Sequence, residues 1–275
     1  MCLSPWPRSN LEKSVTPSTD TVLLSLEGGL AHLRFNRPDA LNTLDVPTAA
    51  LFARHCRALA ADPAVRAVVI TGEGRGFGAG GDLSAFTDDA TEAARLIIEH
   101  MHEAVRLLTT MNAPVVAGLH GVVAGGSLSL ALACDLAIAA EGTKFNLAYV
   151  NVAANCDVSG SYSLPRLVGL RKAMEIALLG ESFGVDEAYR LGLVNRVVPA
   201  AELLEQTLAL GQRLAKGPTL ALGKMKRLLR VSFDHTLNEQ LDLESQAFQD
   251  STRTADFAEA LQAFFAKRKP NFKGA

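Results

Sequence analysis

The segment AVVITGEGRGFGAGGDL, residues 67–83, contains the part of the sequence that decides the fold. It opens with a continuous apolar, β-branched run, which is typical of a strand buried on both faces of a parallel sheet. A loop follows in which six of ten residues are glycine. Glycine allows left-handed backbone and close approach of a ligand. The segment VVAGLHGVVAGG, residues 115–126, has the same order of apolar strand and glycine turn, and leads into a helix. Two such turns can aim backbone N–H groups at one point and form an oxyanion hole, although two tight turns without a ligand would give the same pattern.

The surrounding pattern predicts an α/β core with parallel strand pairing. Residues 21–27 and 30–35 alternate in hydrophobicity around Gly28-Gly29, which is typical of a hairpin. Further strands are expected at residues 67–70, 115–117 and 136–139, and helices at 47–61, 91–110 and 127–134. Beyond Val198 only helical patterns remain, at residues 201–216, 218–231, 236–249 and 256–267. We therefore predict a flexible tail at residues 1–19, an α/β core at 20–199 and a helical assembly region at 200–275.

Composition and charge exclude several classes of protein. Apolar residues make up 48% of the chain, and 27 Lys and Arg nearly balance 29 Asp and Glu. No basic surface for nucleic acid is therefore expected. Residues 113–140 contain one charged residue and are long enough to span a membrane, but Pro114 and four glycines favour strands and turns instead. The N-terminus has no apolar stretch of signal-peptide length, and the cysteines have no CxxC or metal-ligand spacing. A cytoplasmic location and no metal site are expected.

Nucleotide binding is a rival interpretation of the first glycine loop. Residues 76–81, GFGAGG, formally match the GxGxxG pattern of dinucleotide sites. The match lies deep in the chain, however, and Asp82 would place a carboxylate where a pyrophosphate should rest. This interpretation is therefore disfavoured.

Five motifs in order resemble the crotonase superfamily, the enoyl-CoA hydratase/isomerase family. Residues 77–83, FGAGGDL, resemble its first oxyanion loop, and HGVVAGG at 120–126, running on to ACD at 133–135, resembles the second. RPDALN at 37–42 is similar to its substrate-access segment. LPRLVG at 164–169 and KRKP at 267–270 also fit. The resemblance covers about residues 20–272.

This resemblance implies a fold, a substrate class and an assembly. The fold is a spiral of ββα units, with trimers built through the C-terminal helices and often paired into hexamers. The substrate is an acyl-CoA thioester whose carbonyl oxygen lies between the N–H groups of Gly81 and Gly126. Coenzyme A enters as part of the substrate, and no other cofactor is implied. The residues expected to bind its CoA portion are Arg37, Ala40, Leu41, Ala79, Gly80, Asp82, Leu83 and Lys267.

The acid and base groups decide which reaction is expected. Hydratases of this family use two glutamates, but the matching positions here hold Ser129 and Tyr149, which are not carboxylates. Asp157 matches the aspartate that transfers protons in dienoyl-CoA isomerases and in isomerases of phenylacetate degradation. The same position holds the nucleophilic aspartate of 4-chlorobenzoyl-CoA dehalogenase, and His102 matches its catalytic histidine. The apolar neighbours of Asp157 should raise its pKa, as suits a proton shuttle.

We therefore expect double-bond isomerisation of an enoyl-CoA through an enolate, with Asp157 carrying the proton. The alternatives are hydration with Asp157 as the only acid or base, aspartyl-ester hydrolysis of an aryl-CoA, and a non-catalytic acyl-CoA-binding role. In that last case Asp157 would be a turn residue. A thioesterase triad could use Ser127 or Ser129 with His102 and Asp157, although the GxSxG pattern is absent. Tyr149 could stack on a flat acyl group or only line the pocket.

Overall fold

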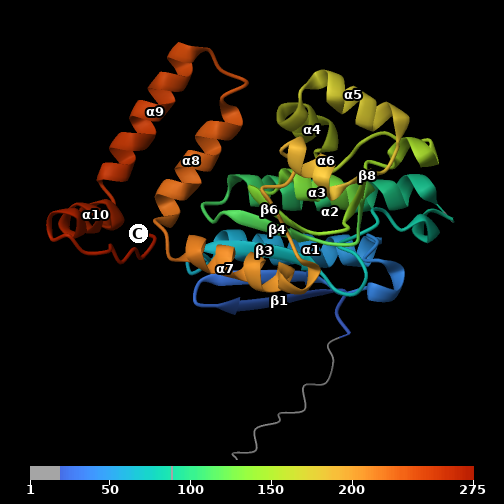
Figure 1. Ribbon diagram of the computed structural model, residues 1–275, viewed down its shortest axis with the longest axis horizontal. Coiled ribbons are helices and arrows are strands. Elements are labelled where there is room, and N and C mark those ends of the chain that lie inside the picture. Colours follow the sequence, from blue (N-terminus) through green and yellow to red (C-terminus); the bar gives the residue numbers. More distant parts are fainter. Residues whose placement is uncertain (1–18, 88) are drawn as a thin grey trace, which may run out of the picture.

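The computed structural model describes residues 19–87 and 89–275 (Figure 1). Within these residues the strands form two sheets, and the larger one lies at the centre of the fold. The predicted tail, residues 1–19, lies outside the described residues except for its last position. β1 and β2 form the predicted hairpin and pair antiparallel, and the remaining neighbours pair parallel. In spatial order the six strands are β1 (Val22–Glu27), β2 (Leu30–Phe35), β3 (Ala67–Gly72), β4 (Val115–Leu119), β6 (Leu136–Ala140) and β9 (Arg196–Val198).

A smaller sheet lies beside the two glycine turns. It consists of β5 (Val122–Ala124), β7 (Lys144–Asn146) and β8 (Phe183–Gly184), and β5 pairs parallel with β7. The chain passes from β4 of the large sheet to β5 of the small one through Gly121, whose φ is +57°. A Cβ at this position would lie 1.9 Å from the Arg75 carbonyl oxygen, so only glycine fits there.

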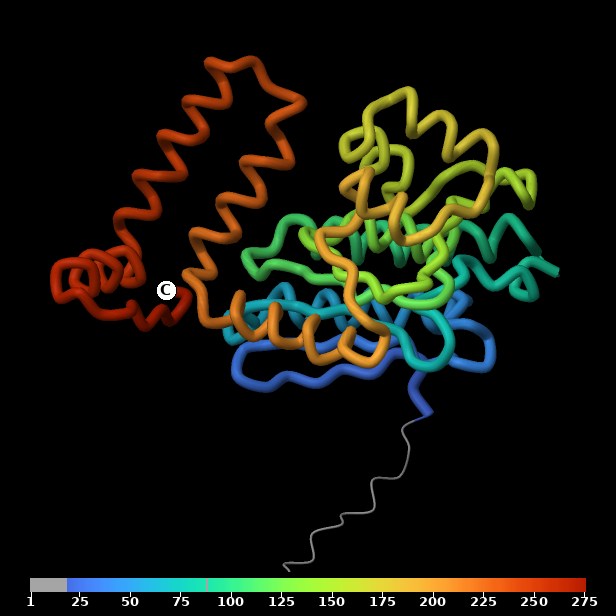
Figure 2. The backbone as a smooth tube through the Cα atoms, viewed as in Figure 1, coloured from blue at the N-terminus to red at the C-terminus, as the bar shows by residue number. Residues whose placement is uncertain are grey.

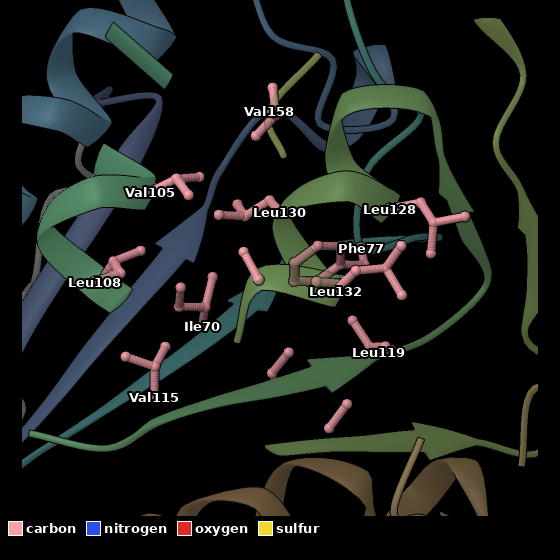
Figure 3. Packing of buried hydrophobic residues seen from close by; sticks show 14 of the residues in the cluster. Ile70, Phe77, Val105, Leu108, Val115, Leu119, Leu128, Leu130, Leu132 and Val158 are labelled. Atoms are coloured by element: carbon pink, nitrogen blue, oxygen red, sulfur yellow. The ribbon is translucent and has the colours of Figure 1, made fainter. Parts of the chain in front are cut away.

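The large sheet is buried on both faces because alternate side chains of each strand point to opposite sides. Val68 and Ile70 pack in the main core with α1 (Val46–Ala61), α2 (Ala90–Thr110) and α3 (Gly125–Ala133). Figure 3 shows part of this core, in which Ile70, Leu108 and Leu130 pack close together. Ala67 and Val69 point to the other face, where they pack with Ala215 of α7 (Leu203–Ala215). The continuously apolar run at residues 67–70 is therefore a strand covered on two sides, as predicted.

Shorter elements connect these layers. The 3₁₀ helices are η1 (Pro38–Ala40), η2 (Leu83–Phe86), η3 (Tyr149–Val152) and η4 (Ala200–Glu202), and the remaining α-helices of the core are α4 (Gly160–Val168), α5 (Leu170–Leu179) and α6 (Val185–Arg190). No helix in the described part of the chain has the length and apolar character needed to cross a membrane.

The C-terminal helices fall into two groups. α7 lies along the sheet so closely that a Cβ on Gly211 would lie 2.7 Å from Val69 Cγ2. α8 (Thr219–Val231), α9 (Leu237–Thr252) and α10 (Ala255–Phe265) instead extend to one side of the core (Figure 2). The packing thus differs from the predicted division at residue 200, because α7 covers the sheet and belongs to the core.

A buried charge cluster fastens α8 to the core. The Asp135 carboxylate accepts hydrogen bonds from the Val115 N–H at 2.9 Å, from Lys226 Nζ at 2.8 Å and from Arg230 Nη2 at 2.7 Å. Lys226 also donates to the carbonyl oxygens of Leu108 at 2.8 Å and Ala113 at 3.0 Å. Burial lowers the pKa of Lys226, while the charge of Asp135 opposes that change. This cluster is the main polar link between α8 and the sheet.

Candidate active site

The first glycine loop is held between two other segments by backbone hydrogen bonds. Gly78 exchanges hydrogen bonds with β5, donating to the Val122 oxygen at 3.1 Å and accepting from the Ala124 N–H at 2.9 Å. On its other side, the Leu44 N–H donates to the Gly80 oxygen at 2.8 Å, and the Asp82 N–H donates to the Leu44 oxygen at 3.0 Å. These two hydrogen bonds use the Gly80 carbonyl oxygen and the Asp82 N–H, which flank the Gly81 N–H in the chain. Among the described residues, the Gly81 N–H therefore has no acceptor in the loop.

The second glycine turn brings Gly126 beside this loop. Gly126 is in the first turn of α3, where backbone N–H groups have no acceptor within the helix. Gly80 has φ of +97°, and a Cβ on it would lie 3.3 Å from Gly125 Cα and 3.4 Å from the Gly126 nitrogen. The two turns can approach this closely only because glycine occupies both. The positive end of the α3 dipole reinforces the donor character of Gly126.

Gly81 and Gly126 both line a cavity of about 660 Å³. Side chains of α2 and η2 form one wall, including Phe86, Ala94, Ile97 and Ile98. The lining also includes residues of η3 and of the segment that follows it. The ionisable side chains in this lining are Asp82, Tyr149 and Asp157, and within the described residues the lining includes no Lys, Arg or His. The cavity can therefore hold an apolar group next to one buried carboxylate.

Asp157 is presented by a turn with unusual backbone. Val158 and Ser159 have φ of +49° and +69°, a left-handed conformation that a β-branched valine rarely adopts. Val158 is 1% exposed and packs in the main core, and its N–H donates to His102 Nε2 at 3.2 Å. Core packing and this hydrogen bond hold the turn. The carboxylate reaches the second glycine turn, because a Cβ on Gly126 would lie 3.6 Å from Asp157 Oδ1.

Burial controls the electrostatics of this carboxylate. Desolvation raises the pKa of Asp157, as its apolar sequence neighbours predict, while hydrogen bonding from Tyr149 and the charge of His102 act in the opposite direction. Within the described residues, neither Lys nor Arg forms an ion pair with Asp157. A carboxylate in this environment takes up and releases protons more readily near neutral pH than an exposed one.

Tyr149 and Ser129 lie behind Asp157 and are joined to it. The Tyr149 hydroxyl donates to Asp157 Oδ1, and it lies 2.9 Å from Ser129 Oγ. Ser129 is 0% exposed and does not line the cavity. The sequence did not reveal this chain of contacts, since Tyr149 and Asp157 are eight residues apart in irregular backbone.

The predicted CoA-binding residues divide into two groups. Ala79, Gly80, Asp82 and Leu83 line the cavity. Arg37 does not; its guanidinium pairs with Asp82 at 2.9 Å and with Asp45 at 3.1 Å. Arg37 thus joins the segment at 37–42 to the first glycine loop. Ala40, Leu41 and Lys267 do not line the cavity either. Leu41, at the end of η1, adjoins it, because the Leu41 oxygen accepts a hydrogen bond from the Ala79 N–H at 3.0 Å, whereas Lys267 follows α10.

The structure does not join the residues of the alternative thioesterase triad. Ser127 Oγ accepts a hydrogen bond from the Gly80 N–H at 3.3 Å, and Ser129 contacts Tyr149. His102 Nε2 accepts from Val158, and His102 does not line the cavity. In the described ranges, no hydrogen bond connects either serine to His102. Over the same ranges, no group of three or more His, Cys, Asp or Glu residues has the arrangement of a metal site.

Comparison with known proteins identifies the family to which the chain is similar. A family model described as enoyl-CoA hydratase/isomerase matches residues 25–275. The 1,2-epoxyphenylacetyl-CoA isomerase of Escherichia coli K12 is 35% identical over 257 residues, covering 92% of this chain and 98% of the relative. A 4-chlorobenzoyl coenzyme A dehalogenase of Arthrobacter is 33% identical over 243 residues, covering 87% of this chain and 88% of the relative. A crystal structure of an enoyl-CoA hydratase from Polaromonas superposes with a TM-score of 0.86 at 32% identity, covering 92% of this chain and 99% of that one.

Proposed function

Because the chain belongs to the enoyl-CoA hydratase/isomerase family, we propose that it moves a double bond within an enoyl-CoA thioester. The observation that carries this proposal is Asp157, a partly buried carboxylate that lines the same apolar cavity as Gly81 and Gly126. The other carboxylate of the lining, Asp82, is paired with Arg37 at 2.9 Å. One group that both accepts and returns a proton is sufficient for isomerisation. The two-glutamate hydration of related enzymes has no counterpart here, since the matching positions hold Tyr149 and a sealed-off Ser129.

The proposed reaction begins with the thioester carbonyl oxygen between the Gly81 and Gly126 N–H groups. Asp157 removes a proton from the carbon next to the carbonyl, and the electron pair of that C–H bond passes into a conjugated enolate. The two amides stabilise the negative charge that develops on oxygen, an effect for which one donor is typically worth about 10²–10³ in rate. Asp157 then returns the proton to the γ carbon, and the double bond comes to lie beside the thioester.

The cavity lining also favours a class of acyl group. Its walls are apolar, and Asp157 would repel a carboxylate on the acyl group, whereas the charge of Asp82 is already paired with Arg37. We therefore propose an uncharged acyl group, with coenzyme A supplied as part of the substrate.

The exposed apolar side chains of α8 to α10, such as Leu229, Phe233 and Phe264, support the proposed trimer or hexamer, because such surfaces mark interfaces.

Mass spectrometry in heavy water tests the proposal. The protein is incubated with 2-enoyl-, 3-enoyl- and aryl-CoA thioesters, and each product is examined for added deuterium, added water, free CoA or released halide. Isomerisation predicts that the 3-enoyl thioester becomes its 2-enoyl isomer, and that this product gains deuterium to the extent that the proton held by Asp157 exchanges with solvent before it is returned. Asp157→Asn should abolish this conversion.

The other products identify the alternatives. Addition of a whole water to the 2-enoyl thioester would indicate a hydratase, and halide release from a 4-halobenzoyl thioester would indicate aspartyl-ester chemistry like that named for the Arthrobacter relatives. Release of free CoA would indicate a thioesterase. Binding without any product, measured by calorimetry on the same panel, or full isomerisation by the Asp157→Asn variant, would overturn the proposal.

A further inference from the structure

We infer that Tyr149 is a positioning residue that binds one oxygen of Asp157 and leaves the other oxygen, Oδ2, to carry the proton. This inference rests on the proposed function, in which Asp157 is the proton shuttle. It assigns separate roles to the two carboxylate oxygens. It also gives a purpose to the two residues that occupy the positions of the family's glutamates.

The direction of each hydrogen bond follows from the number of protons available. A tyrosine hydroxyl has one proton, and Tyr149 donates it to Asp157 Oδ1. In the 2.9 Å contact between Tyr149 and Ser129, the serine must therefore be the donor. The result is a directed chain in which Ser129 donates to Tyr149, and Tyr149 donates to Asp157.

Packing fixes the position of Ser129, the first residue of this series of hydrogen bonds. Ser129 lies in α3 and is fully buried. A Cβ on Gly160 would come within 2.5 Å of Ser129 Oγ, so the serine hydroxyl lies directly against the backbone of α4. Ser129 thus has little freedom to move, and it holds the phenol of Tyr149 at a fixed point beside the carboxylate.

The second oxygen of Asp157 has no such partner. Among the described residues, no group donates a hydrogen bond to Asp157 Oδ2, and Asp157 lines the cavity. The Tyr149 hydroxyl therefore occupies Oδ1 whichever form the carboxyl takes. When a substrate C–H bond breaks, its proton forms a new O–H bond at Oδ2, and Tyr149 keeps its own proton throughout. Burial together with the charge of Asp157 raises the pKa of Tyr149, which keeps the phenol protonated.

Tyr149 also affects the proton affinity of the shuttle. Within the described ranges, the titratable groups that interact with Asp157 are Tyr149 of η3, His102 of α2 and the neighbouring Cys156. Hydrogen bonding from Tyr149 favours the charged carboxylate and lowers the pKa of Asp157 against the effect of burial. Without the phenol hydroxyl, the carboxylate should hold its proton to higher pH and act less well as a base.

The test compares four variants by their pH profiles and by carbon-13 NMR of the Asp157 carboxyl group. Tyr149→Phe removes only the hydroxyl, and Ser129→Ala removes the group that orients it. Tyr162→Phe is the matched control, because the Tyr162 hydroxyl also donates to a carboxylate, Asp234, at 3.4 Å on an exposed surface. Asp157→Asn identifies the NMR signal and tests the proposed function separately.

We expect Tyr149→Phe to lower kcat roughly 10–100-fold, with little change in KM. This is less than the 10²–10⁴-fold that a general acid–base group typically contributes, because Tyr149 acts only through Asp157. The acidic limb of its pH profile and the NMR titration should both move to higher pH. Ser129→Ala should produce the same changes with a smaller size, and Tyr162→Phe should leave them unaltered.

Two outcomes would overturn the inference. One is an unchanged Asp157 titration in Tyr149→Phe. The other is a loss of kcat in Tyr149→Phe without any movement of the pH profile, which would indicate a merely structural role. Failure of the proposed function is distinguishable from these, because it would appear as activity retained by Asp157→Asn, while the NMR titration still reports on the Tyr149 contact.

Discussion

Removing the carboxylate of Asp135 is expected to destabilise the protein strongly. Asp135 is the only carboxylate paired with Lys226 in the described part of the chain, and the side chains of Asp135 and Lys226 are 13% and 8% exposed. Asp135→Ala leaves the Lys226 ammonium with two carbonyl oxygens and leaves the Val115 N–H without its acceptor. Breaking a buried pair in this way typically costs about 3–5 kcal/mol. At 2–4 °C per kcal/mol for a chain of this size, Tm should fall by roughly 6–20 °C.

Calorimetry at one fixed protein concentration measures this change. The control is Asp250→Ala, which breaks an exposed helix pair with Arg253 at 3.1 Å and should change the free energy of unfolding by less than about 0.5 kcal/mol. The double variant Asp135→Leu/Lys226→Met removes the unpaired buried ammonium and should recover part of the lost stability, although the Val115 N–H still lacks its acceptor. A Tm for Asp135→Ala within the range of the control, or a double variant as unstable as the single one, would refute the reasoning.

Three further predictions concern the site and the cysteines. Because the folded protein raises the pKa of Asp157, the native state binds this proton more tightly than the unfolded chain, so Asp157 costs stability above its folded pKa. Asp157→Asn should therefore raise Tm at neutral to alkaline pH, and calorimetric scans should show the gain shrinking as the pH falls through the folded pKa towards the ordinary aspartate value of about 4. Gly126→Ala should fold, since its Cβ would make only ordinary contacts of 3.6 Å or more. It should nevertheless lower turnover by roughly 10²-fold, because the added methyl group displaces the bound thioester from the amide donors. Gly121→Ala, by contrast, should fail to give folded protein in circular dichroism. Burial raises the pKa of the Cys56 thiol, so peptide mapping after iodoacetamide treatment should show Cys56 alkylated only in denaturant, and labelling of the native protein would contradict this packing.

The strands and helices follow closely from the sequence. The strand pattern at residues 67–70 predicted β3, which extends to Gly72, and the helical pattern at 91–110 predicted α2, found at Ala90–Thr110. Asp45, a residue type that favours helix N-caps, caps α1 by accepting a hydrogen bond from the Thr48 N–H at 2.9 Å. These features depend on local periodicity and capping, so they are visible without knowledge of the fold. The family, too, was identified from motifs alone.

The role of α7 was not visible in the sequence. Its helical pattern resembles those of α8, α9 and α10, and a pattern does not state which surface a helix covers. Only the tertiary structure distinguishes α7, which packs on Val69 and Leu30 of the sheet, from the helices that extend beyond it.

The candidate site shows the same division between local and distant information. The sequence determined the two glycine turns, the absence of both glutamates and the presence of Asp157, because each is a matter of residue type at a motif position. The structure decided what surrounds Asp157: Tyr149 on one oxygen, His102 on the following amide and Ser129 behind the phenol. These partners come from η3, α2 and α3, and only the folding of the chain brings them together. Hydrogen bonding and desolvation act over a few ångströms in space, whatever the separation of the residues in the sequence.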